Sequence, residues 1–204
     1  MGKETEQKQE IVNQGVHTYS QEEAYVWPEE PVLREQLEWF QDQKLALMVH
    51  WGVYNQLGMV ASWALSDEDA EWSRKTVDWT DDGEVFKRQY RALNRAFDPV
   101  AFQPEEWAKM AKKCGFRYLI LTTKHHDGFC LWDTAYTEYK TTAEDCPFHT
   151  HKYADIVRAM FDAFRKEKLG IGVYYSKADW HCPDYWEKEK VFTGKTTRNP
   201  TYNP

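Results

Sequence analysis

Three largely apolar runs set the framework of this chain. They cover residues 45–50, 118–123 and 171–176. None of them alternates apolar with polar positions, as a strand with one face in water would. Runs that are apolar along their whole length are typical of parallel strands buried on both faces. We therefore predict three parallel strands over these ranges.

Helical patterns lie between and before the predicted strands. Residues 104–115 begin with Pro and two Glu, carry apolar side chains on one face and end in Gly, which is a complete helix signature. Residues 156–166 carry an apolar stripe opposite charged positions. A further helix is predicted near 84–97, and apolar residues within 33–40 fall at roughly helical spacing.

The alternation of strand and helix predicts an α/β fold with right-handed βαβ crossovers. Such crossovers occur in doubly wound sheets and in (β/α)8 barrels. No glycine-rich phosphate-binding turn follows a predicted strand, which counts against a nucleotide-binding sheet. Each strand ends in residues suited to chemistry, and the strand ends of barrels carry the active site. We predict a (β/α)8-like (TIM) barrel, of which this chain holds about the first three β/α units.

The division of the chain follows from the same patterns. Residues 1–31 are polar, with two prolines near their end, and are predicted to form an N-terminal arm. Residues 32–204 are predicted to be the N-terminal portion of a barrel, truncated after the third strand. The stretch 54–104 is too long for an ordinary loop, and we expect it to form an excursion over the barrel mouth.

Composition narrows the partners. The 204 residues carry a net charge of -7, which argues against nucleic acid. No apolar run approaches the roughly 20 residues that span a membrane, and the polar start shows no export signal. Four cysteines without a CxxC pair indicate neither a zinc site nor a disulfide scaffold. The ten tryptophans suit the flat apolar faces of sugars, although large core residues are an equally good interpretation.

Three histidines stand at the ends of two predicted strands, His50 after the first and His125 and His126 after the second. Such a cluster has three interpretations: it holds a metal, it performs acid–base chemistry, or it grips vicinal hydroxyl groups. A single histidine would more often satisfy a buried carbonyl. Three together favour a functional site.

Three segments carry a family resemblance. In chain order they are residues 47–54 (LMVHWGVY), 122–132 (TTKHHDGFCLW) and 172–176 (GVYYS), and together they resemble the α-L-fucosidases of glycoside hydrolase family 29. The middle segment is highly specific, and the resemblance covers roughly residues 36–204. It implies a retaining exo-glycosidase that removes terminal α-L-fucose from oligosaccharides or glycoconjugates, without a cofactor. Family members are lysosomal, periplasmic or secreted, so the compartment stays open.

The resemblance also implies site residues. Four side chains are expected to contact fucose hydroxyls: His50, His125, His126 and Tyr174. The family's Glu-Trp pair on the long loop after the first strand matches Glu71 and Trp72 best, with Trp63 as a rival. We expect Trp51 or Trp72 to line the apolar side of the sugar.

Catalysis by a retaining glycosidase needs two carboxyl groups about 5–5.5 Å apart. The resemblance places the nucleophilic aspartate at the end of the fourth strand and the acid/base later still, so both are expected after Pro204. Asp127 and Asp179 also follow strand ends, but we expect them to bind backbone N–H groups. We therefore predict no catalytic residue in this chain.

Two other functions remain open from sequence. One is an inactive fragment or fucose-binding module that lacks the nucleophile. The other is a zinc hydrolase that uses the three histidines, weakened by the absence of an HExxH motif. Because three strands leave open sheet edges, we also expect a second copy or a completing chain as a partner.

Overall fold

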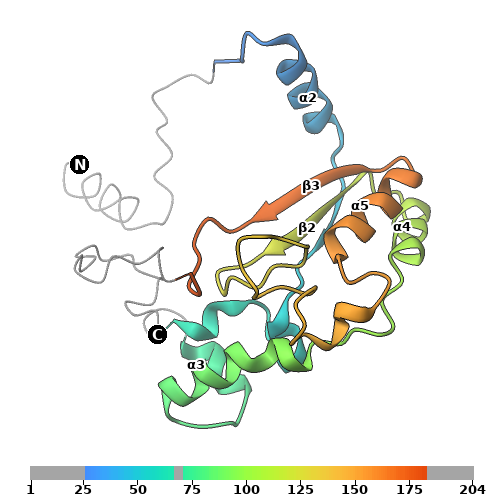
Figure 1. The fold of residues 1–204 in the computed structure, drawn as a ribbon. Helices are drawn as coiled ribbons and strands as arrows, with labels where there is room; N and C mark the ends of the chain where they lie inside the picture. Colours follow the sequence, from blue (N-terminus) through green and yellow to red (C-terminus); the bar gives the residue numbers. More distant parts are fainter. Residues whose placement is uncertain (1–25, 67–70, 183–204) are drawn as a thin grey trace, which may run out of the picture. The chain divides into compact units, whose positions relative to one another are not determined.

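Three parallel strands form the sheet of this computed structural model, in the order β1 (Ala46–Val49), β2 (Tyr118–Lys124) and β3 (Gly170–Tyr175) (Figure 1). The structure describes residues 26–66 and 71–182, with Glu71, Trp72 and Thr76 by their backbone alone. In register, Tyr118 lies between Ala46 and Gly170. All three predicted strands and the α/β class are confirmed.

The crossover helices form where the sequence predicts them. α4 (Pro104–Lys113) leads into β2, and α5 (Ile156–Lys166) leads into β3. Pro and two glutamates open α4 and two lysines close it, which suits the helix dipole. Asp155 caps α5 by accepting a hydrogen bond from the backbone N–H of Arg158 at 2.9 Å.

The two crossover helices pack on each other, and α5 also packs on β2 and β3 (Figure 1). The core between helices and sheet consists of fully buried side chains. Its central members are Ala108, Ala111, Leu119, Leu121, Ile156, Met160 and Phe164. Burial of such a set is the main favourable contribution to folding.

Burial corrects one prediction about the strands. β2 is largely buried, as expected for a central strand. The outer strands are not buried on both faces: Met48 of β1 is 51% exposed, and Val173 of β3 is 55% exposed. Among the described residues each outer strand has a neighbouring strand on one side only, so some of its apolar side chains stay exposed.

The long stretch after β1 is mostly helical. It contains the short 3-10 helices η1 (Val53–Leu57), η2 (Ser62–Leu65) and η3 (Glu71–Thr76), then α3 (Gly83–Arg91) and η4 (Ala92–Ala96). The helix predicted near 84–97 is thus confirmed, although its last turns tighten into 3-10 geometry. A further 3-10 helix, η5 (Pro147–Thr150), precedes α5.

The chain divides into two compact units, Met1–Asp42 and Gln43–Pro204. The first contains α2 (Pro31–Asp42), whose first backbone N–H groups are capped by the side chain of Glu30. This confirms the helical spacing seen in residues 33–40. The predicted arm lies outside the described residues as far as residue 25, and its boundary stays a prediction. Among the described helices, none is long and apolar enough to cross a membrane.

Candidate functional site

Four side chains predicted to bind the ligand meet at the carboxyl ends of the three strands. The ring centroids of His50 and His125 lie 5.0 Å apart, and those of His125 and His126 lie 4.3 Å apart. Tyr174 stacks on His125 at 5.8 Å and meets His50 edge-on at 6.0 Å. Parallel strands in register bring their ends to one edge of the sheet, so residues far apart in sequence form one aromatic cluster.

Each histidine is held by a hydroxyl group at Nδ1. His50 Nδ1 lies 2.8 Å from Thr122 Oγ1 on β2. His125 Nδ1 lies 2.5 Å from Ser62 Oγ on η2. For His50 and His125, the structure gives no hydrogen bond to Nε2 within residues 26–66 and 71–182. These two nitrogens are therefore able to bind a ligand hydroxyl.

His126 follows the same pattern on the other side of the cluster. Its Nδ1 lies 2.5 Å from Ser176 Oγ, directly after β3. The indole of Trp180 packs on its ring at 4.8 Å between centroids, and the backbone N–H of Trp180 donates to the His126 carbonyl at 2.7 Å. Sequence reasoning missed all three hydroxyl partners and Trp180.

Burial favours the uncharged forms of His50, His125 and Tyr174. It lowers the pKa of His125 to about 2, with His126 and His50 adding to the effect, and it also lowers the pKa of His50. Burial raises the pKa of Tyr174. Neutral imidazoles and a protonated phenol are hydrogen-bonding groups rather than charged ones, which suits an uncharged, hydroxyl-rich ligand.

Tyr54 is a further member of the cluster that the sequence did not single out. It is fully buried, with its ring 5.4 Å from His50 and 5.7 Å from His125. Its hydroxyl has no hydrogen-bond partner among the described residues. Burial, followed by Asp127 and Tyr174, raises its pKa. A Cβ atom on Gly52 would lie 2.5 Å from its ring, so Gly52 makes room for Tyr54.

The two carboxylates near the strand ends bind backbone N–H groups, as predicted. Asp127 accepts from the N–H of Phe129 at 3.1 Å and from the hydroxyl of Tyr90 at 2.8 Å. It is buried, and burial raises its pKa to about 6 although these two hydrogen bonds oppose the shift. Both oxygens of Asp127 are thus engaged inside the protein.

Asp179 is engaged in the same way. It accepts from the backbone N–H groups of His181 at 3.0 Å and Cys182 at 2.9 Å, and it pairs with Lys124 Nζ at 2.8 Å. Burial alone would raise its pKa, but the bonds from Lys124 and the backbone outweigh burial and hold that pKa below its usual value. No local sequence pattern predicts the Lys124–Asp179 pair, because the two residues are 55 positions apart.

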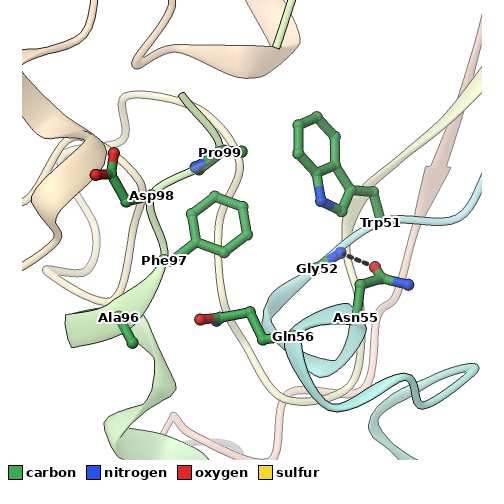
Figure 2. Close-up of a pocket in the computed structure, with 8 residues that line it drawn as sticks. All are labelled: Trp51, Gly52, Asn55, Gln56, Ala96, Phe97, Asp98 and Pro99. Carbon is green, nitrogen blue, oxygen red and sulfur yellow. Dashed lines mark hydrogen bonds between the residues drawn. The ribbon is translucent and has the colours of Figure 1, made fainter. Parts of the chain in front are cut away.

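The structure does not bring Trp51 to the histidines. Its ring packs on Phe97, Phe102 and Trp107, with centroids 5.1 to 6.0 Å away. Trp51 and Phe97 line a cavity of about 260 Å³ whose lining includes none of the three histidines. Their side chains are drawn in Figure 2. Neighbouring residues of an extended segment point to opposite sides, so Trp51 turns away from the side that His50 faces. This packing does not support the expectation that Trp51 lines the sugar, which stays a prediction.

The other predicted loop residues have different outcomes. Trp63 is half-buried and packs against the hydrophobic core, while its neighbour Ser62 holds His125. The backbones of Glu71 and Trp72 open η3. The side chains of both lie outside the described residues, so their predicted roles stay predictions.

The geometry gives no support to a zinc centre. Across residues 26–66 and 71–182, no three His, Cys, Asp or Glu side chains are arranged to hold a metal ion. The Nδ1 atom of each of the three histidines is hydrogen-bonded to a hydroxyl group.

Comparisons with known proteins agree with the resemblance. The family model described as Alpha-L-fucosidase matches residues 12–203. The tissue alpha-L-fucosidase of Rattus norvegicus is 31% identical over 147 residues, which cover 72% of this chain and 31% of that protein. The chain thus spans about a third of the length of the curated relatives it matches.

Solved structures show the same likeness. Alpha-L-fucosidase isoenzyme 1 from Paenibacillus thiaminolyticus is 37% identical with a TM-score of 0.56, over 74% of this chain and 31% of that one. An alpha-L-fucosidase from Bacteroides thetaiotaomicron, trapped as a covalent intermediate with 2-fluoro-fucosyl fluoride, is 30% identical with a TM-score of 0.57. That match covers 80% of this chain and 34% of the Bacteroides protein.

Proposed function

Because the chain belongs to the alpha-L-fucosidase family, we propose that the whole protein hydrolyses terminal α-L-fucosides and that this chain builds one side of the fucose pocket. The cluster of three histidines and Tyr174 at the strand ends carries the proposal. Its hydrogen-bonding groups match the hydroxyls of an uncharged sugar. The covalent intermediate trapped in the Bacteroides relative supports a two-step, retaining reaction.

We extend the sheet to a (β/α)8 barrel, with residues 1–31 as an arm and 32–204 as the first part of the catalytic domain. Strand order follows chain order, and the two crossover helices pack on each other. This arrangement is typical of a barrel, since a doubly wound sheet reverses its strand order at a switch point. Further barrel strands would cover Met48 and Val173 on the outer strands. A second copy of the chain is the alternative cover.

In this proposal the chain binds and orients fucose, and other residues perform the chemistry. A retaining reaction begins when one carboxylate attacks the anomeric carbon while a carboxylic acid protonates the departing oxygen. Water then releases fucose, with the second residue acting as base. Asp127 and Asp179 do not fit either role, because their oxygens are engaged by Tyr90, Lys124 and backbone N–H groups. The family resemblance implies that both catalytic carboxylates follow Pro204.

The histidines contribute through transition-state binding. Hydrogen bonds to sugar hydroxyls beside the reacting carbon strengthen as positive charge develops on the ring. Uncharged imidazoles make such bonds without competing with the catalytic carboxylates for protons. The protein's ligand is then a fucosylated oligosaccharide or glycoconjugate, of which this chain contacts the terminal sugar.

Hydrolysis of a chromogenic aryl α-L-fucoside by the intact protein tests the proposal. His126→Ala is expected to lower kcat/KM about 10- to 100-fold, the cost of losing a hydrogen bond to the bound sugar. His149→Ala is the matched control, because His149 is an exposed histidine on η5. Equal kcat/KM for wild type and His126→Ala would remove His126 from the site.

A second function is a fucose-binding module without turnover. It is favoured by the two strand-end carboxylates, both of which are engaged within the fold. It predicts saturable binding of L-fucose by the intact protein together with no hydrolysis at any pH. Hydrolysis that His126→Ala weakens would exclude it.

A further inference from the structure

We infer that Ser176 is a positioning residue that fixes the tautomer of His126, so that His126 meets a sugar hydroxyl as a hydrogen-bond acceptor through Nε2. The inference about the sugar rests on the proposed function. The inference about the tautomer rests on the protein alone. Together they assign the direction of one hydrogen bond between this chain and its ligand.

The direction follows from the hydrogens available. Ser176 Oγ lies 2.8 Å from the Ala178 carbonyl and 2.5 Å from His126 Nδ1. A carbonyl oxygen can only accept, so the single hydroxyl hydrogen of Ser176 points to Ala178. Ser176 Oγ must then accept from His126, which places a proton on Nδ1. In a neutral imidazole the other nitrogen, Nε2, carries a lone pair and accepts.

The ring and the serine are held in this relation by the backbone. The N–H of Ser176 donates to the carbonyl of Lys124 at 3.0 Å, which ties the segment after β3 to the end of β2. The N–H of Trp180 donates to the carbonyl of His126, and its indole packs on the imidazole. The hydroxyl of Ser176 therefore faces Nδ1 in a segment that is anchored on both sides.

A buried ion pair also stabilises the segment after β3. Lys124 Nζ contacts Asp179 Oδ2 at 2.8 Å, and the side chains are only 4% and 23% exposed. The other oxygen of Asp179 accepts from the N–H groups of His181 and Cys182. Residues 176–182 are thus pinned by side-chain and backbone bonds together, so Ser176 has little freedom to turn away from His126.

The other two histidines lack this constraint. Among the described residues, Thr122 Oγ1 and Ser62 Oγ have no second hydrogen-bond partner. Either hydroxyl is therefore able to donate to its histidine or to accept from it. His126 is thus the histidine of the cluster for which the fold fixes which ring nitrogen donates and which accepts. It therefore discriminates between ligand groups that donate a hydrogen bond and ligand groups that only accept one.

Nuclear magnetic resonance of the intact protein with 15N-labelled histidine tests the tautomer. At pH 8, where an ordinary imidazole is neutral, we expect the His126 signals to show a protonated Nδ1 and an unprotonated Nε2. Ser176→Ala should shift these signals toward a mixture of tautomers, and Ser176→Thr should restore them. Ser62→Ala is the matched control, because it removes the hydroxyl partner of His125 and leaves that of His126.

Two results would overturn the assignment: a protonated Nε2 in the wild type, or identical His126 signals in wild type and Ser176→Ala. The wild-type spectrum decides the tautomer by itself, so a variant that fails to fold does not leave the question open. If Ser176→Ala loses its signal dispersion and Ser176→Thr does not, the Ala variant has unfolded. The wild-type spectrum then decides the tautomer.

The direction of the bond to sugar is tested separately with monodeoxy and monodeoxyfluoro L-fucoses. Fluorine accepts a hydrogen bond weakly and cannot donate one. At the hydroxyl that His126 contacts, we expect both replacements to weaken binding by a similar factor of about 10. Weakening by the deoxy sugar alone at every position would contradict an acceptor role. Absence of any fucose binding, with the tautomer as assigned, would count against the proposed function only.

Discussion

The pair formed by Lys124 and Asp179 gives the most demanding test of how the site is held. Lys124→Met removes the ammonium group and keeps most of the stem. The Lys124 side chain is 4% exposed and that of Asp179 is 23% exposed, so the carboxylate left behind is poorly solvated. Two backbone N–H groups continue to bind it.

The expected magnitude follows from this environment. Removing one partner of a buried ion pair costs about 3–5 kcal/mol, because the other charge stays buried without compensation. The partial exposure of Asp179 and its two N–H donors place the cost at the lower end, at about 3 kcal/mol.

The chain also provides a matched control. Lys109 and Glu106 lie 2.7 Å apart on α4, but their side chains are 59% and 60% exposed. An exposed pair contributes about 0–1 kcal/mol, so Lys109→Met should change stability by less than about 0.5 kcal/mol.

Urea denaturation followed by tryptophan fluorescence measures both costs. A double-mutant cycle with Lys124→Met and Asp179→Asn isolates the pair from the contact of Lys124 with the Tyr175 ring. We expect a coupling energy of about 2 kcal/mol there, and one near zero for Lys109→Met with Glu106→Gln. Equal coupling energies in the two cycles would refute the view that the buried pair of Lys124 and Asp179 stabilises residues 176–182.

Three other substitutions probe the same region, and Gly115→Ala after α4 serves as a control. Gly128→Ala and Gly115→Ala share the strain of a positive φ, at 81° and 83°, but only at Gly128 would Cβ collide with the Asp179 carboxylate, at 2.6 Å. Gly128→Ala should therefore lower the free energy of unfolding, measured by urea denaturation, by at least about 2 kcal/mol more than Gly115→Ala. Equal losses would count against the close packing of Gly128 on Asp179. Burial raises the folded-state pKa of Asp127 from 3.8 to about 6, so the folded protein binds that proton more tightly. Wild type should therefore gain up to about 3 kcal/mol over Asp127→Asn as pH falls from 7 to 4, and a constant difference would contradict this. Burial lowers the folded-state pKa of His125 from 6.5 to about 2, so wild type should lose about 1.4 kcal/mol per pH unit relative to His125→Asn below pH 6.5, with a flat difference above pH 8; a flat difference throughout would mean that His125 is not buried.

The strands, crossover helices and gathering of the histidines were predictable from sequence for one reason. Apolar periodicity reports which residues a single element buries, and parallel strands bring their carboxyl ends to one edge. His50, His125, His126 and Tyr174 therefore meet without any knowledge of the loops. The backbone roles of Asp127 and Asp179 were predictable from their place in turns directly after strands.

The rest depends on how distant segments cross. Ser62 reaches His125 and Ser176 reaches His126 across 63 and 50 residues, and no local pattern encodes such pairs. The packing of Trp51 on Phe97, Phe102 and Trp107 was not predictable, because adjacency to His50 in sequence does not say which neighbours the side chain has. The burial of the outer strands was overestimated because their apolar pattern reports neighbours that the described residues do not supply.

The most direct test of the fucose pocket is a titration of the intact protein with L-fucose, followed by the 15N signals of its histidines. We expect saturable shifts of the His50, His125 and His126 signals, while the signal of the exposed His149 stays in place. Saturating L-fucose that leaves all three signals unmoved, or that moves only His149, would show that the cluster at the strand ends does not bind the sugar.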